Sequence, residues 1–196
     1  MFWKTTYSSP LGELTLVCDD RALRSLILPG QEISETGAGE HPILAQTKDW
    51  LDRYFAGEAP DPAELPLEPR GTPFRALVWK LLLEIPQGKT VTYGQLAQKA
   101  AQILGKPRMS AQAVGQALRQ NPIPVIIPCH RVLGADGSLT GYAGAQEGGL
   151  ELKRALLELE SPQPGLILFA GVADANPGQL PDAAGASVVL DPERII

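Results

Sequence analysis

The stretch TYGQLAQKAAQILGKPRMSAQAVGQALRQN (residues 92–121) decides the fold of the larger part of this chain. Thr92 can cap a helix that runs to about residue 104, and Ser110 can cap a second helix that ends near Asn121. The glycine and proline of residues 105–108 turn the chain between the two helices. Two helices joined by a turn, with basic residues beside the second, are typical of a helix-turn-helix, although an ordinary helical hairpin has the same pattern.

The second helix has two unlike sides when it is drawn at about 100° per residue. One side can pack inward, whereas the opposite side is small, polar and cationic and carries no carboxylate. Small residues let a helix backbone approach a phosphodiester chain, and Gln and Arg can then hydrogen-bond to phosphates or bases. We therefore predict that this side binds DNA, with Arg131 as a further contact. The candidates on the helix are Ser110, Ala111, Gln112, Gly115, Gln116 and Arg119.

The net charge of −5 is unevenly distributed along the chain. Residues 1–70 carry six basic and twelve acidic side chains, and residues 161–196 carry one basic and four acidic ones. Residues 71–160 carry ten basic and six acidic side chains, with no acidic residue between Glu84 and Asp136. A polyanion would be drawn to this middle part, although a solvated basic face without a partner has the same composition.

The amino-terminal part, residues 1–70, is predicted to be a small α+β domain. Short runs of β-branched and aromatic residues at 2–7, 13–18 and 22–28 predict strands, and an apolar stripe predicts a helix over about 42–56. The Pro-rich, acidic residues that follow have the composition of a linker, and we place the domain boundary within about 57–71.

The second predicted domain, residues 71–160, is mainly helical. Besides the two central helices, it has a helix that begins at Thr72 and a last helix over about 149–160. Residues 161–196 are dominated by Pro, Gly and Ala and are predicted to form a loosely ordered extension. No apolar run approaches the length of a membrane span, and the first residues do not resemble a signal peptide, so we expect a cytoplasmic protein.

The second domain also contains the candidate nucleophile, Cys129. A thiol attacks as its thiolate, so it needs a base or a positive field at neutral pH. His130 is adjacent and can take the proton, directly or through one water, if a carboxylate orients its other nitrogen. The candidate carboxylates are Asp136, Glu158 and Glu160.

Two other interpretations of this cysteine are weighed. A buried structural cysteine beside an incidental histidine is the common case for an isolated pair. A zinc site could combine Cys129 and His130 with Cys18 and His41, but adjacent ligands lack the usual spacing. We therefore predict no metal site.

The ordered motifs of residues 71–160 resemble the O6-alkylguanine-DNA alkyltransferases, also called methylated-DNA–protein-cysteine methyltransferases. IPCHRV at 127–132 resembles their active-site signature. The flanking order also matches: GTPFRALVWKLLLEIPQGKTVTYGQLA, then AVGQALRQNPIPVIIPCHRV, then GSLTGYAG, then LKRALLELE. The resemblance implies an α+β fold with a ribonuclease-like amino-terminal domain and a winged-helix-like carboxyl-terminal domain.

The resemblance also implies a mechanism. The second central helix would dock in the minor groove, and the damaged guanine would be flipped out of the stack into a pocket. Cys129 would take the alkyl group, His130 would accept its proton through a water, Glu160 would orient His130, and Tyr93 would donate to the departing guanine. The substrate would be bound by Asn121, which also ties the helix to the active-site turn, and by Val132, Tyr142 and Ala143.

The implied partner is double-stranded DNA that contains O6-alkylguanine, with O4-alkylthymine as a further substrate. A thioether has no easy route back to the thiol, so each protein molecule would react once. We expect the protein to act as a monomer. No cofactor is needed. The sequence departs from the family pattern at Gln112, where an arginine usually enters the DNA stack, and at residues 145–148, which look inserted.

Three alternative functions remain open. A DNA-binding relative without transfer activity would sense lesions for another pathway, but such relatives lack the cysteine. A helix-turn-helix regulator would need a dimerisation segment. A cysteine hydrolase would need an oxyanion hole and a distant histidine, which the adjacent His130 does not match.

Overall fold

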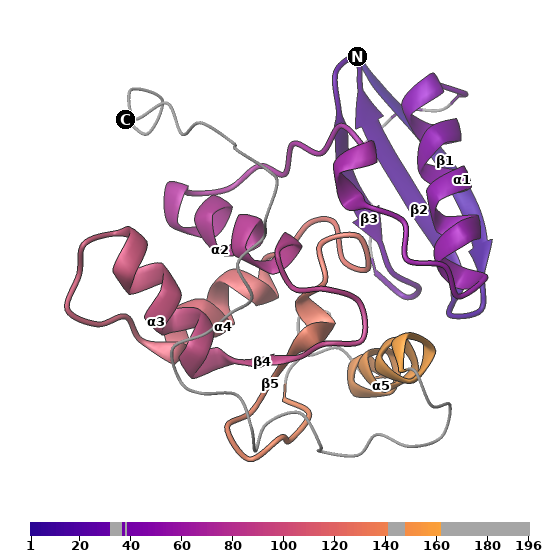
Figure 1. Ribbon diagram of the computed structural model, residues 1–196. Helices are drawn as coiled ribbons and strands as arrows, with labels where there is room; N and C mark the ends of the chain where they lie inside the picture. The colour runs from indigo at the N-terminus through magenta and orange to yellow at the C-terminus, as the bar shows by residue number, and fades with distance from the viewer. Residues whose placement is uncertain (32–36, 38, 141–147, 162–196) are drawn as a thin grey trace.

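The computed structural model describes residues 1–31, 37, 39–140 and 148–161. These residues form a sheet with one long helix, followed by a unit built mainly of helices (Figure 1). This is the α+β arrangement expected from the sequence. The predicted carboxyl-terminal extension lies outside the described residues, apart from Ser161.

The amino-terminal unit is an antiparallel three-stranded sheet. Its strands β1 (Phe2–Ser9), β2 (Gly12–Asp19) and β3 (Leu23–Ile27) lie in that order. Both faces of the central strand β2 are covered, because Leu14 to Cys18 are all buried. Helix α1 (Pro42–Phe55) packs against β1 and β2 and buries Leu44, Trp50, Leu51 and Tyr54.

The segment between the two units is held against the sheet. It contains the short 3₁₀ helix η1 (Pro62–Glu64), in which Asp61 and Glu64 form a capping box. The Nε1 group of Trp50 donates a hydrogen bond to the Asp61 carbonyl at 3.0 Å, and the amide of Leu23 donates to the Pro66 carbonyl at 2.8 Å. The Pro-rich segment is therefore an ordered connection that packs on the amino-terminal unit rather than a flexible linker.

Three helices form the body of the second unit: α2 (Pro73–Leu83), α3 (Tyr93–Ile103) and α4 (Ala111–Arg119). Each begins where the sequence predicts, because the hydroxyls of Thr72, Thr92 and Ser110 accept backbone amides of the first turns. The three helices pack on one another, and Trp79 Nε1 donates to the Ala117 carbonyl at 2.8 Å.

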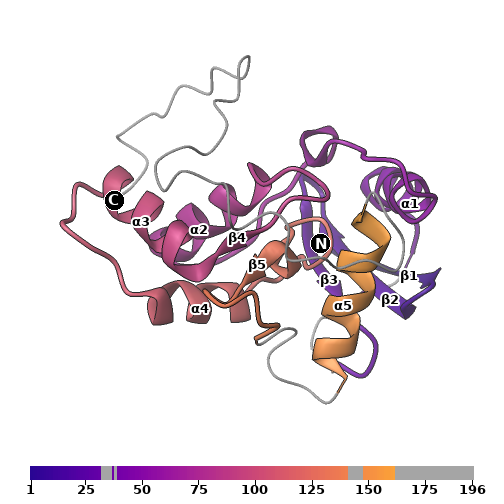
Figure 2. The same ribbon diagram turned by 60° about the horizontal axis from the view of Figure 1, so that its bottom comes forward.

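The chain between α4 and the last helix forms a buried turn. The 3₁₀ helix η2 (Cys129–Arg131) leads into β5 (Val132–Leu133), which pairs in parallel with β4 (Val91–Thr92). Helix α5 (Gly149–Glu160) lies beside η2, close to the sheet, in both views (Figures 1 and 2). Among the described helices, none is long and apolar enough to cross a bilayer.

The apolar run Ile123–Pro128 is β-prone in sequence and buried in the structure, yet it forms no strand. Its prolines cannot donate to a ladder, and the amide of Ile127 instead closes a turn onto the Ile123 carbonyl at 2.9 Å. Val125 lies in this turn with φ of 74°, a conformation that a β-branched residue rarely adopts. The turn is joined to the sheet, because the amide of Leu26 donates to the Pro122 carbonyl at 2.9 Å.

Candidate active site

Cys129 lies at the first position of η2, directly after Pro128, and is 6% exposed. The Asn121 side-chain amide donates to the Cys129 sulfur at 3.2 Å and to the Ile127 carbonyl at 2.8 Å. The Asn121 Oδ1 atom accepts the amide of Ile123 at 3.0 Å. Asn121 therefore braces the turn that carries the cysteine and places a donor on the sulfur.

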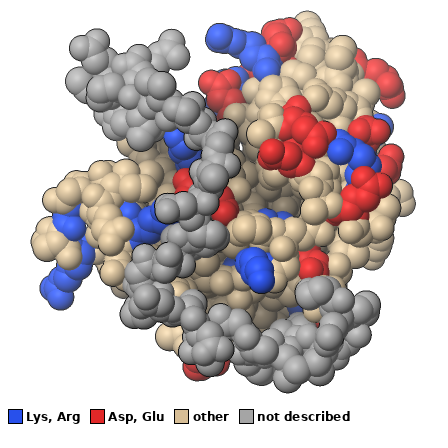
Figure 3. All heavy atoms as spheres, in the orientation of Figure 1, with Lys and Arg blue, Asp and Glu red and all other residues tan. Residues whose placement is uncertain are grey.

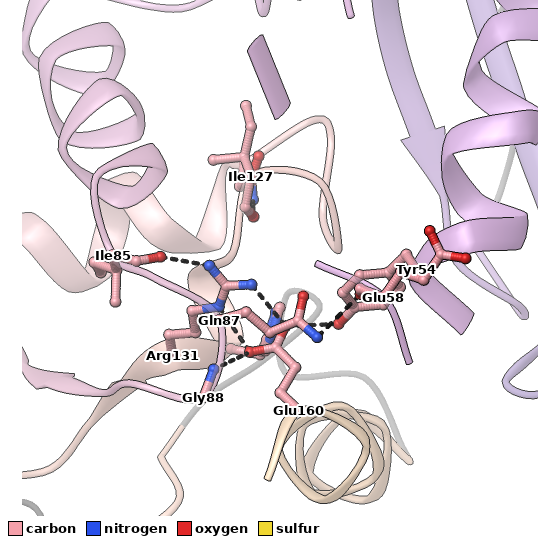
Figure 4. A network of polar contacts seen from close by, with 10 residues as sticks. Tyr54, Glu58, Ile85, Gln87, Gly88, Ile127, Arg131 and Glu160 are labelled. Carbon is pink, nitrogen blue, oxygen red and sulfur yellow. Dashed lines mark hydrogen bonds and ion pairs between the residues drawn. The ribbon is translucent and has the colours of Figure 1, made fainter. Parts of the chain in front are cut away.

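Glu160, at the end of α5, joins the residues that follow Cys129 into one buried cluster (Figure 4). Its Oε1 atom lies 2.7 Å from His130 Nε2, and its two oxygens accept Nη2 and Nε of Arg131 at 2.8 and 2.7 Å. The amide of Gly88 lies 3.4 Å from Oε2, and Arg131 also donates to the Ile85 carbonyl. Of the three carboxylates that the sequence left open, Glu160 is the one placed on His130.

Burial sets the ionisation of these groups. It raises the pKa of the Cys129 thiol to about 11, although the Asn121 hydrogen bond and the charge of Lys153 act in the opposite direction. It lowers the pKa of His130 and outweighs the opposing effect of Glu160. Burial alone would raise the pKa of Glu160, but hydrogen bonds from His130 and Arg131 hold that pKa well below its usual range. The resting site therefore pairs a neutral thiol with a neutral imidazole and an ionised carboxylate.

Tyr93 opens α3, and Lys153 points into the same region from α5. The Tyr93 hydroxyl donates to the Thr140 carbonyl at 3.0 Å, and burial raises its pKa. Lys153 is fully buried and donates to the carbonyls of Val132 and Thr140 at 2.6 and 3.0 Å, with its ammonium 5.8 Å from the Tyr93 ring centre. Burial lowers the pKa of Lys153 to about 8. The structure thus places a positive charge near Cys129 that the sequence analysis did not identify.

Comparisons with known proteins agree with this arrangement. Residues 73–162 match the family model of the 6-O-methylguanine DNA methyltransferase DNA-binding domain, and residues 2–69 match that of its ribonuclease-like domain. A methylated-DNA–protein-cysteine methyltransferase of Mycobacterium tuberculosis (strain H37Rv) is 45% identical over 158 residues, 79% of this chain and 90% of the relative. The chain belongs to this family.

Further members support the assignment. The constitutive methyltransferase of Bacillus subtilis (strain 168) is 38% identical over 167 residues, 82% of this chain and 96% of the relative. The crystal structure of the M. tuberculosis O6-methylguanine methyltransferase has a TM-score of 0.68 at 42% identity and covers 82% of this chain and 93% of that one. A crystal structure of M. tuberculosis OGT in complex with DNA has a TM-score of 0.67 at 44% identity, with coverage of 81% of this chain and 92% of that one. The family and the fold class predicted from the sequence are confirmed.

The family's DNA-binding domain presents the outer side of α4 to solvent. Ala111, Gln112, Gln116 and Arg119 are exposed, whereas Gly115 is half-buried beside the Tyr93 ring. Ser110 is exposed, and its hydroxyl accepts the amide of Gln112 at 3.1 Å. Figure 3 shows one face of the molecule, where most acidic side chains lie over the amino-terminal unit and basic side chains lie over both units. The basic side chain of Lys99 forms an ion pair with Glu84, with 2.6 Å between Lys99 Nζ and Glu84 Oε2.

Arg131 requires a correction. We predicted that it contacts DNA, but it is only 8% exposed, and its guanidinium binds the Glu160 carboxylate and the Ile85 carbonyl. A buried charge needs such partners, so Arg131 cannot turn to a phosphate without breaking its hydrogen bonds to Glu160 and to the Ile85 carbonyl. Its role in the structure is to hold Glu160.

The predicted substrate-binding residues differ in where they lie in the structure. Asn121 touches Cys129, as described above. Val132 is fully buried in β5, and its carbonyl accepts Lys153. Tyr142 and Ala143, and most of the 145–148 insertion, lie outside the described residues.

Sequence reasoning missed two residues of this cluster, Tyr54 and Lys153. Tyr54 falls within the apolar stripe that predicts the helix over about 42–56, and nothing in the sequence indicated a partner for its hydroxyl. Lys153 did leave a signal: Lys153, Leu157 and Glu160 follow the i, i+4, i+7 spacing of one helix face, and all three are buried.

Proposed function

We propose that this protein repairs DNA by transferring the alkyl group of O6-alkylguanine from double-stranded DNA to Cys129, once per molecule. The observation that carries the proposal is the arrangement at η2: a buried thiol, followed by a neutral histidine that Glu160 holds. In a member of this family, that arrangement is the machinery needed to make a thiolate in the presence of substrate.

Recognition begins with the basic, carboxylate-free side of α4. Helices α3 and α4 act as a helix-turn-helix, with α4 in the minor groove, where Gln116 and Arg119 meet the phosphate chains and Gln112 enters the stack. The alkylated guanine must leave the duplex because its O6 substituent is out of reach inside the stack. O4-alkylthymine carries the same kind of alkyl ether and is a second candidate substrate.

The transfer step then follows from the groups around the sulfur. His130 takes the thiol proton through a water, and Glu160 stabilises the imidazolium that forms. The positive charge of Lys153 and the Asn121 amide stabilise the thiolate. Sulfur attacks the alkyl carbon, a C–S bond forms, the C–O6 bond breaks, and its electron pair goes to the guanine.

The departing guanine receives a proton from Tyr93, and Tyr93 is reprotonated with the proton that His130 took from the thiol. The thiol proton is thus passed, in net terms, to the guanine. The thioether product is neutral and inert, so the reaction ends with one turnover. The cluster is built from a single chain, consistent with action as a monomer. Cys129 must remain a reduced thiol. We therefore propose that the protein acts in the cytoplasm, where the environment is reducing.

The test treats the protein with duplex DNA containing O6-methylguanine and then determines the mass of the peptide that bears residue 129. One added methyl group, absent in Cys129→Ala, is the expected result. Tight binding without a mass change would support a lesion sensor instead, and multiple turnovers would contradict a single-use protein.

Gln112 is tested separately. The variant Gln112→Arg restores the side chain that the family pattern has at this place, so we expect it to change the repair of duplex DNA only. Its reaction with free O6-benzylguanine, which needs no base flipping, should stay unchanged. An equal change with both substrates would show that residue 112 does not act through DNA.

A further inference from the structure

Tyr54 connects the amino-terminal unit to the candidate active site. It lies in α1, is 1% exposed, and donates its hydroxyl to Glu160 Oε1 at 2.7 Å, across 106 positions of sequence (Figure 4). Burial and the Glu160 charge raise the pKa of Tyr54 far above its usual value, so it remains a neutral donor.

The oxygen that Tyr54 contacts is the one that faces His130. Arg131 binds both oxygens of Glu160 and so sets the orientation of the carboxylate. Tyr54 adds a third donor to Oε1, beside His130 Nε2 and Arg131 Nη2. Each hydrogen bond to a carboxylate oxygen draws charge from it, so Tyr54 limits the attraction that this oxygen exerts on a protonated His130.

We propose that Tyr54 is a positioning residue for alkyl transfer: it holds Glu160 against His130 and keeps Glu160 from retaining the proton on His130. The transfer site is then complete only when α1 of the amino-terminal unit is docked against α5. This inference rests on the function proposed above, but it makes a prediction about His130 that can be measured without any alkylated substrate.

The sign of the expected effect follows from the groups around His130. Glu160 and Lys153 act on it from α5, Arg131 acts from its own turn, and Tyr54 acts from α1 through Glu160. The segment after α2 contributes the Ile85 carbonyl, which accepts Arg131. Without the Tyr54 hydroxyl, Glu160 concentrates more charge on Oε1, a protonated His130 is favoured, and its pKa rises.

The variant Tyr54→Phe removes only the hydroxyl. Its matched control is Tyr7→Phe, which removes a tyrosine hydroxyl from the same unit, where Tyr7 donates to Asp52 at 2.8 Å on the exposed side. The first measurement is the titration of the imidazoles by NMR. The chain has two histidines, and His41 caps α1 by accepting the amide of Ile43 at 3.3 Å, so it reports on the integrity of the helix that carries Tyr54.

We expect Tyr54→Phe to raise the pKa of His130 by about 0.5–1 unit, the effect of one hydrogen bond, with the His41 signals unmoved. The second measurement is the single-turnover rate of methyl transfer against pH. Its acidic limb should move up by the same amount, with a fall in rate of about 3- to 10-fold below the limb. Tyr7→Phe should match the wild type in both measurements.

In a Glu160→Gln background, Tyr54→Phe should produce no further shift, because the carboxylate through which it acts is gone. The inference is overturned if Tyr54→Phe changes neither the His130 titration nor the acidic limb of the rate. A His130 that shows no titration over the accessible pH range in either protein counts as unchanged. Equal movement of the His41 signals overturns it in favour of a structural role. If the wild type fails to transfer a methyl group, the proposed function falls, while the NMR result still decides the role of Tyr54.

Discussion

The side-chain amide of Asn121 lies 3.2 Å from the sulfur of Cys129. The same side chain satisfies the Ile123 amide and the Ile127 carbonyl, so one residue both shapes the turn and touches the nucleophile. Because Asn121 follows α4 almost directly, a movement of the DNA-binding helix would reach the sulfur through it.

Asn121→Ala should therefore slow transfer and destabilise the fold. A hydrogen bond to a charged group contributes about 1.5–3 kcal/mol, so loss of the donor to the thiolate predicts a rate reduced about 10- to 100-fold. The measurement is single-turnover reaction with free O6-benzylguanine, supported by urea unfolding. A variant that unfolds more easily but reacts at the wild-type rate would assign Asn121 to the turn alone.

Glu160 should make the protein sensitive to acid. Its folded pKa is held below its usual range by His130 and Arg131, so the unfolded carboxyl, near pH ~4.3, binds a proton that the folded one does not. The stability that Glu160 contributes is therefore fully present above about pH 4.3 and is lost as the pH falls towards the folded pKa.

Urea unfolding between pH 3 and 7 checks this prediction. Glu160→Gln should lower the stability at pH 7 by about 3–5 kcal/mol, because it leaves Arg131 buried without its carboxylate. The difference from the wild type should shrink in acid. Glu158→Gln, at an exposed position of the same helix, is the control, and an equal pH profile for both variants would contradict the account.

Lys153 should matter for the nucleophile. Its charge lowers the pKa of the Cys129 thiol, which burial otherwise raises to about 11. Lys153→Met should therefore raise the thiol pKa further and slow its alkylation by iodoacetamide, followed as the mass of the peptide that bears residue 129. Arg154→Met changes the next, exposed residue of α5 and should leave the rate unchanged. Equal rates for wild type and Lys153→Met would remove Lys153 from the site.

Arg119 and Arg131 should behave in opposite ways. Arg119→Ala removes an exposed cation of α4, so DNA binding should weaken. The slope of the logarithm of the binding constant against the logarithm of salt concentration should become smaller in magnitude by about 0.9. Arg131→Ala should instead lower stability by about 3–5 kcal/mol, with the salt slope of its folded fraction unchanged. A reduced salt slope for Arg131→Ala would restore our original assignment of this residue to DNA.

Much of the fold could be predicted because its signals are local. The caps at Thr72, Thr92 and Ser110 place the helix starts, since a hydroxyl and the amides that it accepts lie within three residues. The Ile123–Pro128 run shows the limit of such signals. Its apolar composition indicates burial, but the turn that it forms depends on Asn121 and on contact with β3.

The sequence by itself determined the helices of the second unit, the uneven charge and the Cys129–His130 pair, because each depends on residues close together in the chain. Tertiary structure decided which carboxylate serves His130, that Arg131 faces Glu160 rather than DNA, and that Tyr54 and Lys153 join the site. The physical reason is that burial and long-range hydrogen bonds set charge and basicity, and a contact such as Tyr54 to Glu160 exists only once α1 and α5 have packed together.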